Sequence, residues 1–411
     1  MKRYSIQFLI VIILCITLIE LPIPVSNSYV LQSLPLKESI EYVGDDLFDI
    51  QIRSSMLASY IPSVSACIIK NNTIIWSQGY GYYDFKGWKQ PTIHTIYQVA
   101  SVSKTVTATA LLQLYEQGLF DLDDDVNEYL PFSLRNPNYP DIPITFRMLL
   151  SHHASLHDHD EASVSEYFVG EYPLSYVKEL LDSNGEAYHP EFWGNYPPGT
   201  SGNYSNLGLT IVGYLVEILS GTSLEEYCQN HIFIPLEMHN TSFSMEHLPF
   251  ENIACSYIRL GRLYLKIPTI DYTFLDPCGG LFTSLNDLSH FVLAHMNNGT
   301  YNNIHILNET TIKEMHTIQY PQSNPYYGIL YFGLGWLIFK EEFGKVTHGH
   351  DGDIEFSHAR MRIFDENTTA IMYFFNKGFR PRIFPGIIPS IIEHQGDVII
   401  RKLLYEQADR F

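Results

Sequence analysis

The distribution of apolar positions divides the chain into three parts. Two β-type apolar runs, 63–70 and 73–80, are joined by an Asn-Asn turn and predict a β-hairpin. From about 126 to 320, apolar residues recur mainly at helical spacing, with long loops between the helices. β-type runs then return, before a last helix-leaning segment: 333–339, 345–348, 357–364 and 368–375, then 386–406.

This order of elements predicts an α+β fold. A first helix over 38–60 precedes the N-terminal hairpin, and a hairpin alone is too small to be stable. The C-terminal strands can pair with it in one antiparallel sheet flanked by helices. We therefore expect a sheet domain from 29–105 and 325–411, with a large, mainly helical domain inserted at 106–324.

The segment 95–120 holds the first candidate chemistry. A short β-leaning piece runs into a helical pattern, in which Ser101 lies at the helix start and Lys104 three residues later. This spacing places the hydroxyl and the amine on one helical face. A serine becomes a nucleophile when a nearby base accepts its proton, and a desolvated lysine can be that base.

Ser-x-x-Lys alone is a weak signal, because the chain contains a second match at Ser175 and Lys178 that has the features of a helix surface. Two other segments strengthen the first match. Tyr204-Ser-Asn206 follows a turn-rich loop and offers a phenol and an amide. His350-Asp-Gly352 ends a strand, where a glycine permits close approach of the backbone to a ligand.

In this order, the three motifs resemble those of the serine β-lactamase-related family. That family includes class C β-lactamases, penicillin-binding proteins, D-amino-acid peptidases and related esterases. The resemblance covers roughly residues 40 to 380 and implies a β-lactamase/transpeptidase-like fold, which agrees with the element order. Four further sequence segments support the resemblance: 149–156, 197–199, 277–281 and 333–336.

The resemblance implies a serine hydrolase that cleaves an amide or ester of a small molecule or peptide through an acyl-enzyme. Ser101 is then the acylated nucleophile and Lys104 its activating partner, while Tyr204 is the general base or proton relay. Asn206 contacts the substrate amide, and the backbone N–H groups of Ser101 and Asp353 form the oxyanion hole.

The chain departs from the family pattern after Gly352, where glycines often follow but Asp353-Ile-Glu355 stands here. Carboxylates beside an oxyanion oppose its negative charge unless they point away. A catalytically weak or inactive relative that acts as a binding protein is therefore the alternative hypothesis.

His350 occupies the place of a lysine in β-lactamases, and a histidine there implies peptidase- or esterase-like activity. With an ordinary pKa of ~6.5, its charge is expected to change near neutral pH. Nearby Asp351 and Asp353 are expected to favour the protonated form.

The formal net charge of −20, without a basic tract, argues against nucleic acid and anionic membranes as partners. The N-terminal residues 1–28 resemble a signal peptide, with Lys2 and Arg3 before a short apolar run. A secreted or lumenal protein without a stable membrane span is expected, with a retained N-terminal anchor as the alternative. Six N-x-Ser/Thr sequons are consistent with a glycoprotein: Asn71, Asn203, Asn240, Asn298, Asn308 and Asn367.

Four cysteines remain after the predicted cleavage: Cys67, Cys228, Cys255 and Cys278. Neither their pairing nor their presence as free buried thiols can be chosen from the sequence. The histidines and aspartates at 152–160 match no zinc signature, so neither a metal nor another cofactor is predicted.

Overall fold

The computed structural model describes most of the chain. The described residues are 32–33, 47–158, 172–260, 263–269, 274–323, 330–340, 345–354, 356–364, 366, 368–379 and 388–411. The predicted signal peptide at 1–28, the start of the helix expected over 38–60, and His159, Asp160, Glu355 and Asn367 lie outside them.

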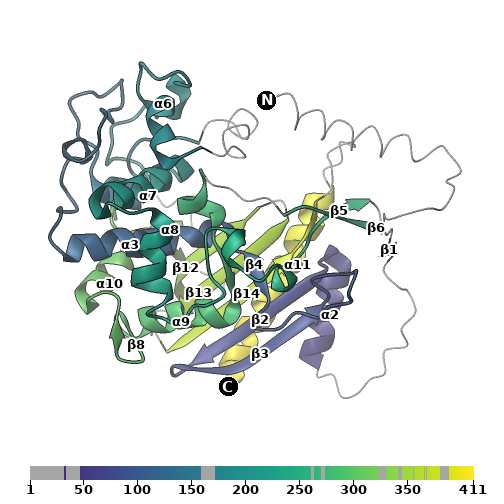
Figure 1. Cartoon of the computed structure of the whole chain (residues 1–411). Coiled ribbons are helices and arrows are strands. Elements are labelled where there is room, and N and C mark those ends of the chain that lie inside the picture. The colour runs from purple at the N-terminus through teal and green to yellow at the C-terminus, as the bar shows by residue number, and fades with distance from the viewer. Residues whose placement is uncertain are drawn as a thin grey trace, which may run out of the picture.

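One seven-stranded sheet forms the centre of the fold (Figure 1). Its pairings are all antiparallel, and β14 near the C-terminus lies beside β2 near the N-terminus. The two ends of the chain therefore build one sheet, as the sequence predicts. In spatial order the strands are β10 (Leu330–Phe332), β11 (Leu337–Lys340), β12 (Val346–Asp353), β13 (Ser357–Phe364), β14 (Thr369–Asn376), β2 (Ser63–Lys70) and β3 (Thr73–Gly81).

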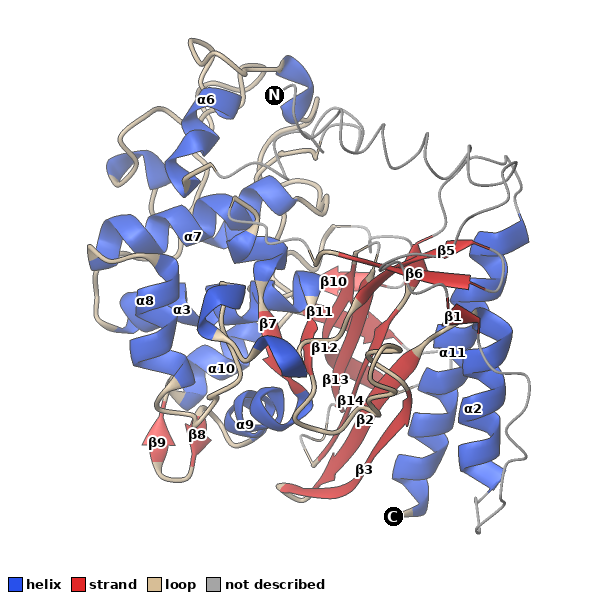
Figure 2. Cartoon of the chain, turned by 45° about the vertical axis from the view of Figure 1, so that its right-hand side comes forward, coloured by secondary structure: helices blue, strands red, loops and turns tan. Residues whose placement is uncertain are grey.

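Both faces of this sheet are buried by helices (Figure 2). Alternate residues of β2 divide between two apolar clusters: Val64, Ala66 and Ile68 join one, and Cys67 and Ile69 join the other. The first cluster packs against α2 (Leu47–Ser59) and α11 (Ile388–Arg410). The second packs against α3 (Ser103–Glu116) and α9 (Leu285–Met296).

The remaining helices lie in the segment between β4 (Ile96–Gln98) and β10. Among the described residues these are the α-helices α4 (Phe146–Leu150), α6 (Val177–Leu181), α7 (Asn206–Ser220), α8 (Leu224–Cys228) and α10 (Glu309–Met315). The same segment contains β7 (Phe282–Ser284), which pairs with β4, and the hairpin of β8 (Thr300–Tyr301) and β9 (Ile304–His305). The domain boundaries at 105/106 and 324/325 remain a prediction.

Two parts of the sequence-based assignment are wrong. Residues 333–336 form a turn between β10 and β11 instead of a strand, and Gly335 there has a φ of +70°, which favours glycine. The hairpin of β5 (Ser256–Leu260) and β6 (Leu263–Ile267) lies within a region expected to be mainly helical. It forms a small second sheet with β1 (Gln32–Ser33) and β15 (Gly378–Phe379).

Cys67, Cys228, Cys255 and Cys278 are free and buried. Among the described residues, no single helix is long and apolar enough to cross a membrane. Only α7 together with Leu224–Phe233 passes by length and composition, and that pair is bent by 75°.

Candidate active site

Ser101 lies in a short 3₁₀ turn, η1 (Ala100–Val102), directly before α3. Ala100 has a φ of +47°, an unfavourable value for a residue with a β-carbon. The hydroxyl of Ser103 holds this turn: it donates to the carbonyl of Ala100 at 2.6 Å and accepts from the N–H of Leu281 at 3.0 Å. A strained backbone supported in this way is typical of functional positions and fixes the direction of Ser101.

Lys104, in the first turn of α3, points its amine at Ser101. Its Nζ lies 2.9 Å from Ser101 Oγ, 2.7 Å from Asn206 Oδ1 and 2.7 Å from the carbonyl of Cys278. The side chain is fully buried, and burial lowers its pKa to about 8, although the charge of Asp158 acts in the opposite direction. A substantial fraction of this amine is therefore neutral near physiological pH.

Tyr204 and Asn206 reach the same amine from the start of α7. Lys104 Nζ lies 4.8 Å from the centre of the Tyr204 ring, and the phenol is hydrogen-bonded to Ser101. Burial raises the pKa of Tyr204 well above its ordinary value, so the phenol keeps its proton in the resting site. The structure thus brings together Ser101, Lys104, Tyr204 and Asn206, all four singled out from the sequence.

His152 makes three contacts with Tyr204 and its two neighbours, and the sequence did not predict them. Its carbonyl accepts from the N–H of Asn203 at 2.8 Å, and its Nδ1 accepts from the N–H of Ser205 at 3.1 Å. Its ring stacks on Tyr204 with the ring centres 4.5 Å apart. The residues on both sides of Tyr204 are therefore hydrogen-bonded to one buried histidine. This histidine lies in the segment 149–156, one of those that support the family resemblance.

Asp158 holds the start of α7. Its carboxylate accepts from the N–H of Asn206 at 2.7 Å and of Leu207 at 3.2 Å, and from the hydroxyl of Ser205 at 3.1 Å. A carboxylate is favoured at a helix N-terminus, where backbone N–H groups are unpaired. Asp158 thereby fixes Asn206, which in turn accepts a hydrogen bond from Lys104. The sequence analysis grouped it with a histidine-rich loop and assigned it no role.

His350 lies on β12 beside these residues, with its ring centre 6.1 Å from that of Tyr204. The expectation that it changes charge near neutral pH is wrong. Burial lowers its pKa to about 3, and the charge of Lys104 acts in the same direction. Its Nδ1 lies 2.6 Å from the carbonyl of Asp351, an acceptor, so Nδ1 carries the proton of a neutral ring.

Gly352 brings the strand against the Ser101 turn. A β-carbon on this residue would lie only 2.0 Å from the carbonyl oxygen of Val99, so no other residue fits without a shift of the backbone. β11 pairs with β12 only as far as Gly349, so it leaves the edge of the later β12 residues free on the side away from β13. η1 packs against these later residues of β12.

The N–H of Asp353 points to that free edge. Ile354 donates its N–H to the carbonyl of Ser357 at 3.1 Å, which closes the turn between β12 and β13. Hydrogen-bonding groups alternate between the two edges of a strand, so the groups of Gly352 face β13 and the N–H of Asp353 faces the opposite edge.

The Asp353 carboxylate is occupied elsewhere: it accepts from Arg360 Nη2 at 2.9 Å and is hydrogen-bonded to His358. Burial acts to raise its pKa, but the charge of Arg360 and the bond with His358 lower it below its ordinary value. Of the two carboxylates that raised doubt about activity, Asp353 is therefore paired, and Glu355 lies outside the described residues.

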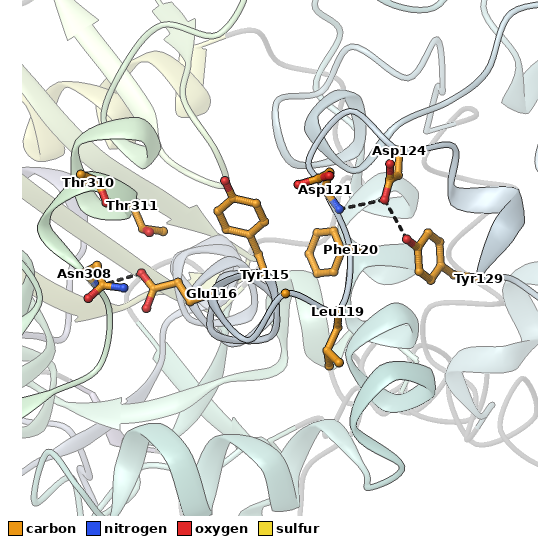
Figure 3. A pocket seen from close by; sticks show the side chains of 11 residues that line it. Tyr115, Glu116, Leu119, Phe120, Asp121, Asp124, Tyr129, Asn308, Thr310 and Thr311 are labelled. Carbon is orange, nitrogen blue, oxygen red and sulfur yellow. Dashed lines mark hydrogen bonds between the residues drawn. The ribbon is translucent and has the colours of Figure 1, made fainter.

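Other candidate sites in the described residues lack a comparable set of reactive side chains. A hollow at the opposite end of α3 has acidic groups that already bind neighbours: Asp124 accepts from Tyr129, and Glu116 accepts from the N–H of Asn308 (Figure 3). Within the described part of the chain, no group of three His, Cys, Asp or Glu side chains is placed to hold a metal ion. Ser175 and Lys178, the second Ser-x-x-Lys match, are both exposed.

Comparison with solved structures identifies the same fold in several proteins. A D-amino acid amidase from Ochrobactrum anthropi SV3, complexed with L-phenylalanine, superposes with a TM-score of 0.66 at 20% identity, covering 88% of this chain and 99% of the amidase. An octameric penicillin-binding protein homologue from Pyrococcus abyssi gives a TM-score of 0.65 at 24% identity, covering 86% of this chain and 77% of the homologue.

Sequence comparison gives the same result. Protein flp of Staphylococcus aureus (strain MW2) is 23% identical over 365 residues, 88% of this chain and 70% of flp. Beta-lactamase-like protein 2 of Dictyostelium discoideum is 26% identical over 273 residues, 64% of this chain and 47% of that protein. The family model named Beta-lactamase matches residues 51–394. The chain therefore belongs to the Beta-lactamase family and is a hydrolase of that family.

Proposed function

We propose that this protein cleaves an amide or ester bond through an acyl-enzyme on Ser101. The observation that carries the proposal is the buried Lys104 amine, 2.9 Å from Ser101 Oγ and with a pKa lowered to about 8. An amine that is partly neutral and in hydrogen-bond contact with a hydroxyl is an effective base for activating that hydroxyl.

In the first step, Ser101 Oγ attacks the substrate carbonyl carbon and its proton passes to neutral Lys104. The carbonyl oxygen becomes an oxyanion, which accepts hydrogen bonds from the N–H groups of Ser101 and Asp353. Tyr204 gives its phenol proton to the leaving nitrogen or oxygen and regains one from Lys104. Water then attacks the acyl-enzyme by the same steps in reverse, releasing the acid and restoring the Ser101 hydroxyl.

This scheme selects between the two roles that the resemblance left open for Tyr204. A phenol whose pKa is raised by burial is protonated at rest and is a poor general base. Hydrogen-bonded to Ser101 and close to Lys104, it is suited to a proton relay between the base and the leaving group.

We propose a small-molecule or peptide substrate with an uncharged group near His350. A lysine in that place would bind a substrate carboxylate by charge, whereas His350 with a pKa of about 3 is neutral in the physiological range. Amide substrates are supported by the similar D-amino acid amidase and by a D-stereospecific amidohydrolase from Streptomyces sp..

Secretion is proposed from the sequence of residues 1–28, and glycosylation from the sequons. Asn71, Asn298 and Asn308 are exposed, as a glycan acceptor must be. Asn203 is half-buried beside Tyr204, and its amide donates to the carbonyl of Leu156 at 3.4 Å, so we expect it to carry no glycan.

The first prediction tests the proposed nucleophile and base. A fluorescent phosphonate should label the wild-type protein and fail to label Ser101→Ala. Lys104→Ala and Tyr204→Phe should each lower kcat/KM for a short ester by ~10²–10⁴-fold, the usual contribution of a positioned acid or base. Lys178→Ala, in the exposed Ser-x-x-Lys match, is the matched control and should retain wild-type activity.

Equal losses of kcat/KM in Lys104→Ala and Lys178→Ala would mean that Ser101 is not the nucleophile. A folded wild-type protein that neither takes the label nor turns over short esters, D-amino-acid amides or nitrocefin would favour the alternative, a binding protein built on this fold.

The second prediction concerns the pH dependence set by Asp158. Its negative charge raises the pKa of Lys104, so Asp158→Asn should lower that pKa and keep the amine neutral at lower pH. The acidic limb of the pH profile of kcat/KM should then shift to lower pH by roughly 0.5–1 unit, as expected for the loss of one nearby charge. The exposed Asp141→Asn should leave the limb in place, and an unmoved limb in Asp158→Asn would show that Lys104 does not set it.

The third prediction concerns substrate charge. Since His350 stays neutral from pH 5.5 to 8.5, the wild-type ratio of kcat/KM for a neutral ester to that for the anionic nitrocefin should exceed one throughout this range. His350→Lys should shift the ratio toward nitrocefin. A ratio unchanged by the substitution at every pH would remove His350 from the substrate site.

A further inference from the structure

Arg360 on β13 lies at the centre of a buried ion cluster behind the Ser101 site. The side chain is only 6% exposed and contacts two carboxylates at hydrogen-bond distance: Asp353 at 2.9 Å and Asp397 at 2.7 Å. Asp351 is 3.5 Å from its Nε. Asp397 belongs to α11 and also accepts from the hydroxyl of Tyr373 at 2.7 Å.

The cluster lies on one face of the sheet. Arg360 is paired across the sheet with Asp351 on β12 and with Tyr373 on β14, so these three side chains share a face, and α11 covers it. Side chains alternate along a strand, so Asp353 shares this face with Asp351, while Gly352 and His350 belong to the opposite face. The Asp353 side chain and the Ser101 turn are therefore on different sides of β12.

Arg360 also binds the backbone. Its Nη1 donates to the carbonyl of Gly352 at 3.0 Å. That carbonyl and the N–H of Asp353 belong to one planar trans peptide and point in opposite directions. A bond that fixes the carbonyl therefore fixes the N–H, and the N–H is directed at the edge of β12 that faces away from β13.

We propose that Arg360 is a positioning residue for the oxyanion hole, holding the Gly352–Asp353 peptide with its N–H toward Ser101 while it neutralises the Asp353 carboxylate. This inference rests on the proposed function. It accounts for a carboxylate where the family often has glycine: the acidic residue supplies only its backbone N–H to the site. Arg360 itself touches neither the substrate nor the reacting atoms.

The test is a double-mutant cycle on kcat for a neutral ester. Arg360→Gln leaves the Asp353 carboxylate without its cation and the peptide less firmly held, so kcat should fall by roughly 10–100-fold, somewhat less than for loss of a whole oxyanion donor. KM should change less than about threefold, since the oxyanion exists only in the transition state. Adding Asp353→Asn should restore kcat at least about fivefold, because the opposing charge is gone.

Arg362→Gln is the matched control. Arg362 is fully buried on the same strand, where it is paired across the sheet with Gly349, and it forms a 2.7 Å ion pair with Asp351. Its replacement should reduce thermal stability as Arg360→Gln does while leaving kcat within about threefold of wild type. If Arg360→Gln does not fold, Arg360→Lys, which keeps the charge but cannot hold both groups, should show a smaller loss with the same recovery by Asp353→Asn.

A folded Arg360 variant with wild-type kcat, or no recovery in the double variant, would overturn the inference. Equal kcat losses in Arg360→Gln and Arg362→Gln would also overturn it. These results are distinguishable from failure of the proposed function, because in that case the wild-type protein itself would not be labelled at Ser101.

Discussion

The site depends on one constraint, a lysine amine enclosed in the core beside a serine. Lys104 has its three hydrogen-bond contacts on three separate parts of the chain: η1, the start of α7 and the carbonyl of Cys278. Burial of an ammonium group is costly, so the amine gives up its proton more readily than a lysine in water. The same enclosure that gathers these elements also makes the amine a base.

Several surrounding elements hold the residues around Lys104 and Ser101 in place. His152 and Asp158 fix the segment 203–207 from one side, and Gly352 lets β12 approach the Ser101 turn from the other. The sheet places the N–H of Asp353 at its free edge, and α11 contributes Asp397 to the cluster behind that edge. Residues separated by hundreds of positions thus act on a few atoms around Ser101 Oγ.

The sequence predicted the sheet and the residues at the centre of the site because their signals are local. β-type apolar runs marked β2 and β14, and motif spacing marked Ser101 and Lys104. It could not predict the environment of His350: its low pKa follows from burial and from Lys104, which is distant in sequence. The role of Asp158 likewise comes from a contact across 48 positions, and the cluster around Arg360 includes Asp397, 37 positions away, so no periodicity records either. The β5–β6 hairpin was missed because its runs are short and lie among helices.

The most direct test of this account is the pKa of Lys104 itself. Selective ¹³C labelling of lysine side chains, with Lys104 assigned by its absence in Lys104→Arg, permits an NMR titration of the free protein. The account predicts a midpoint near 8, where the buried amine titrates, well below the ~10.4 of a lysine in water. A Lys104 midpoint at or above the ordinary value would contradict it, since the amine would then be a permanent cation and not the base that activates Ser101.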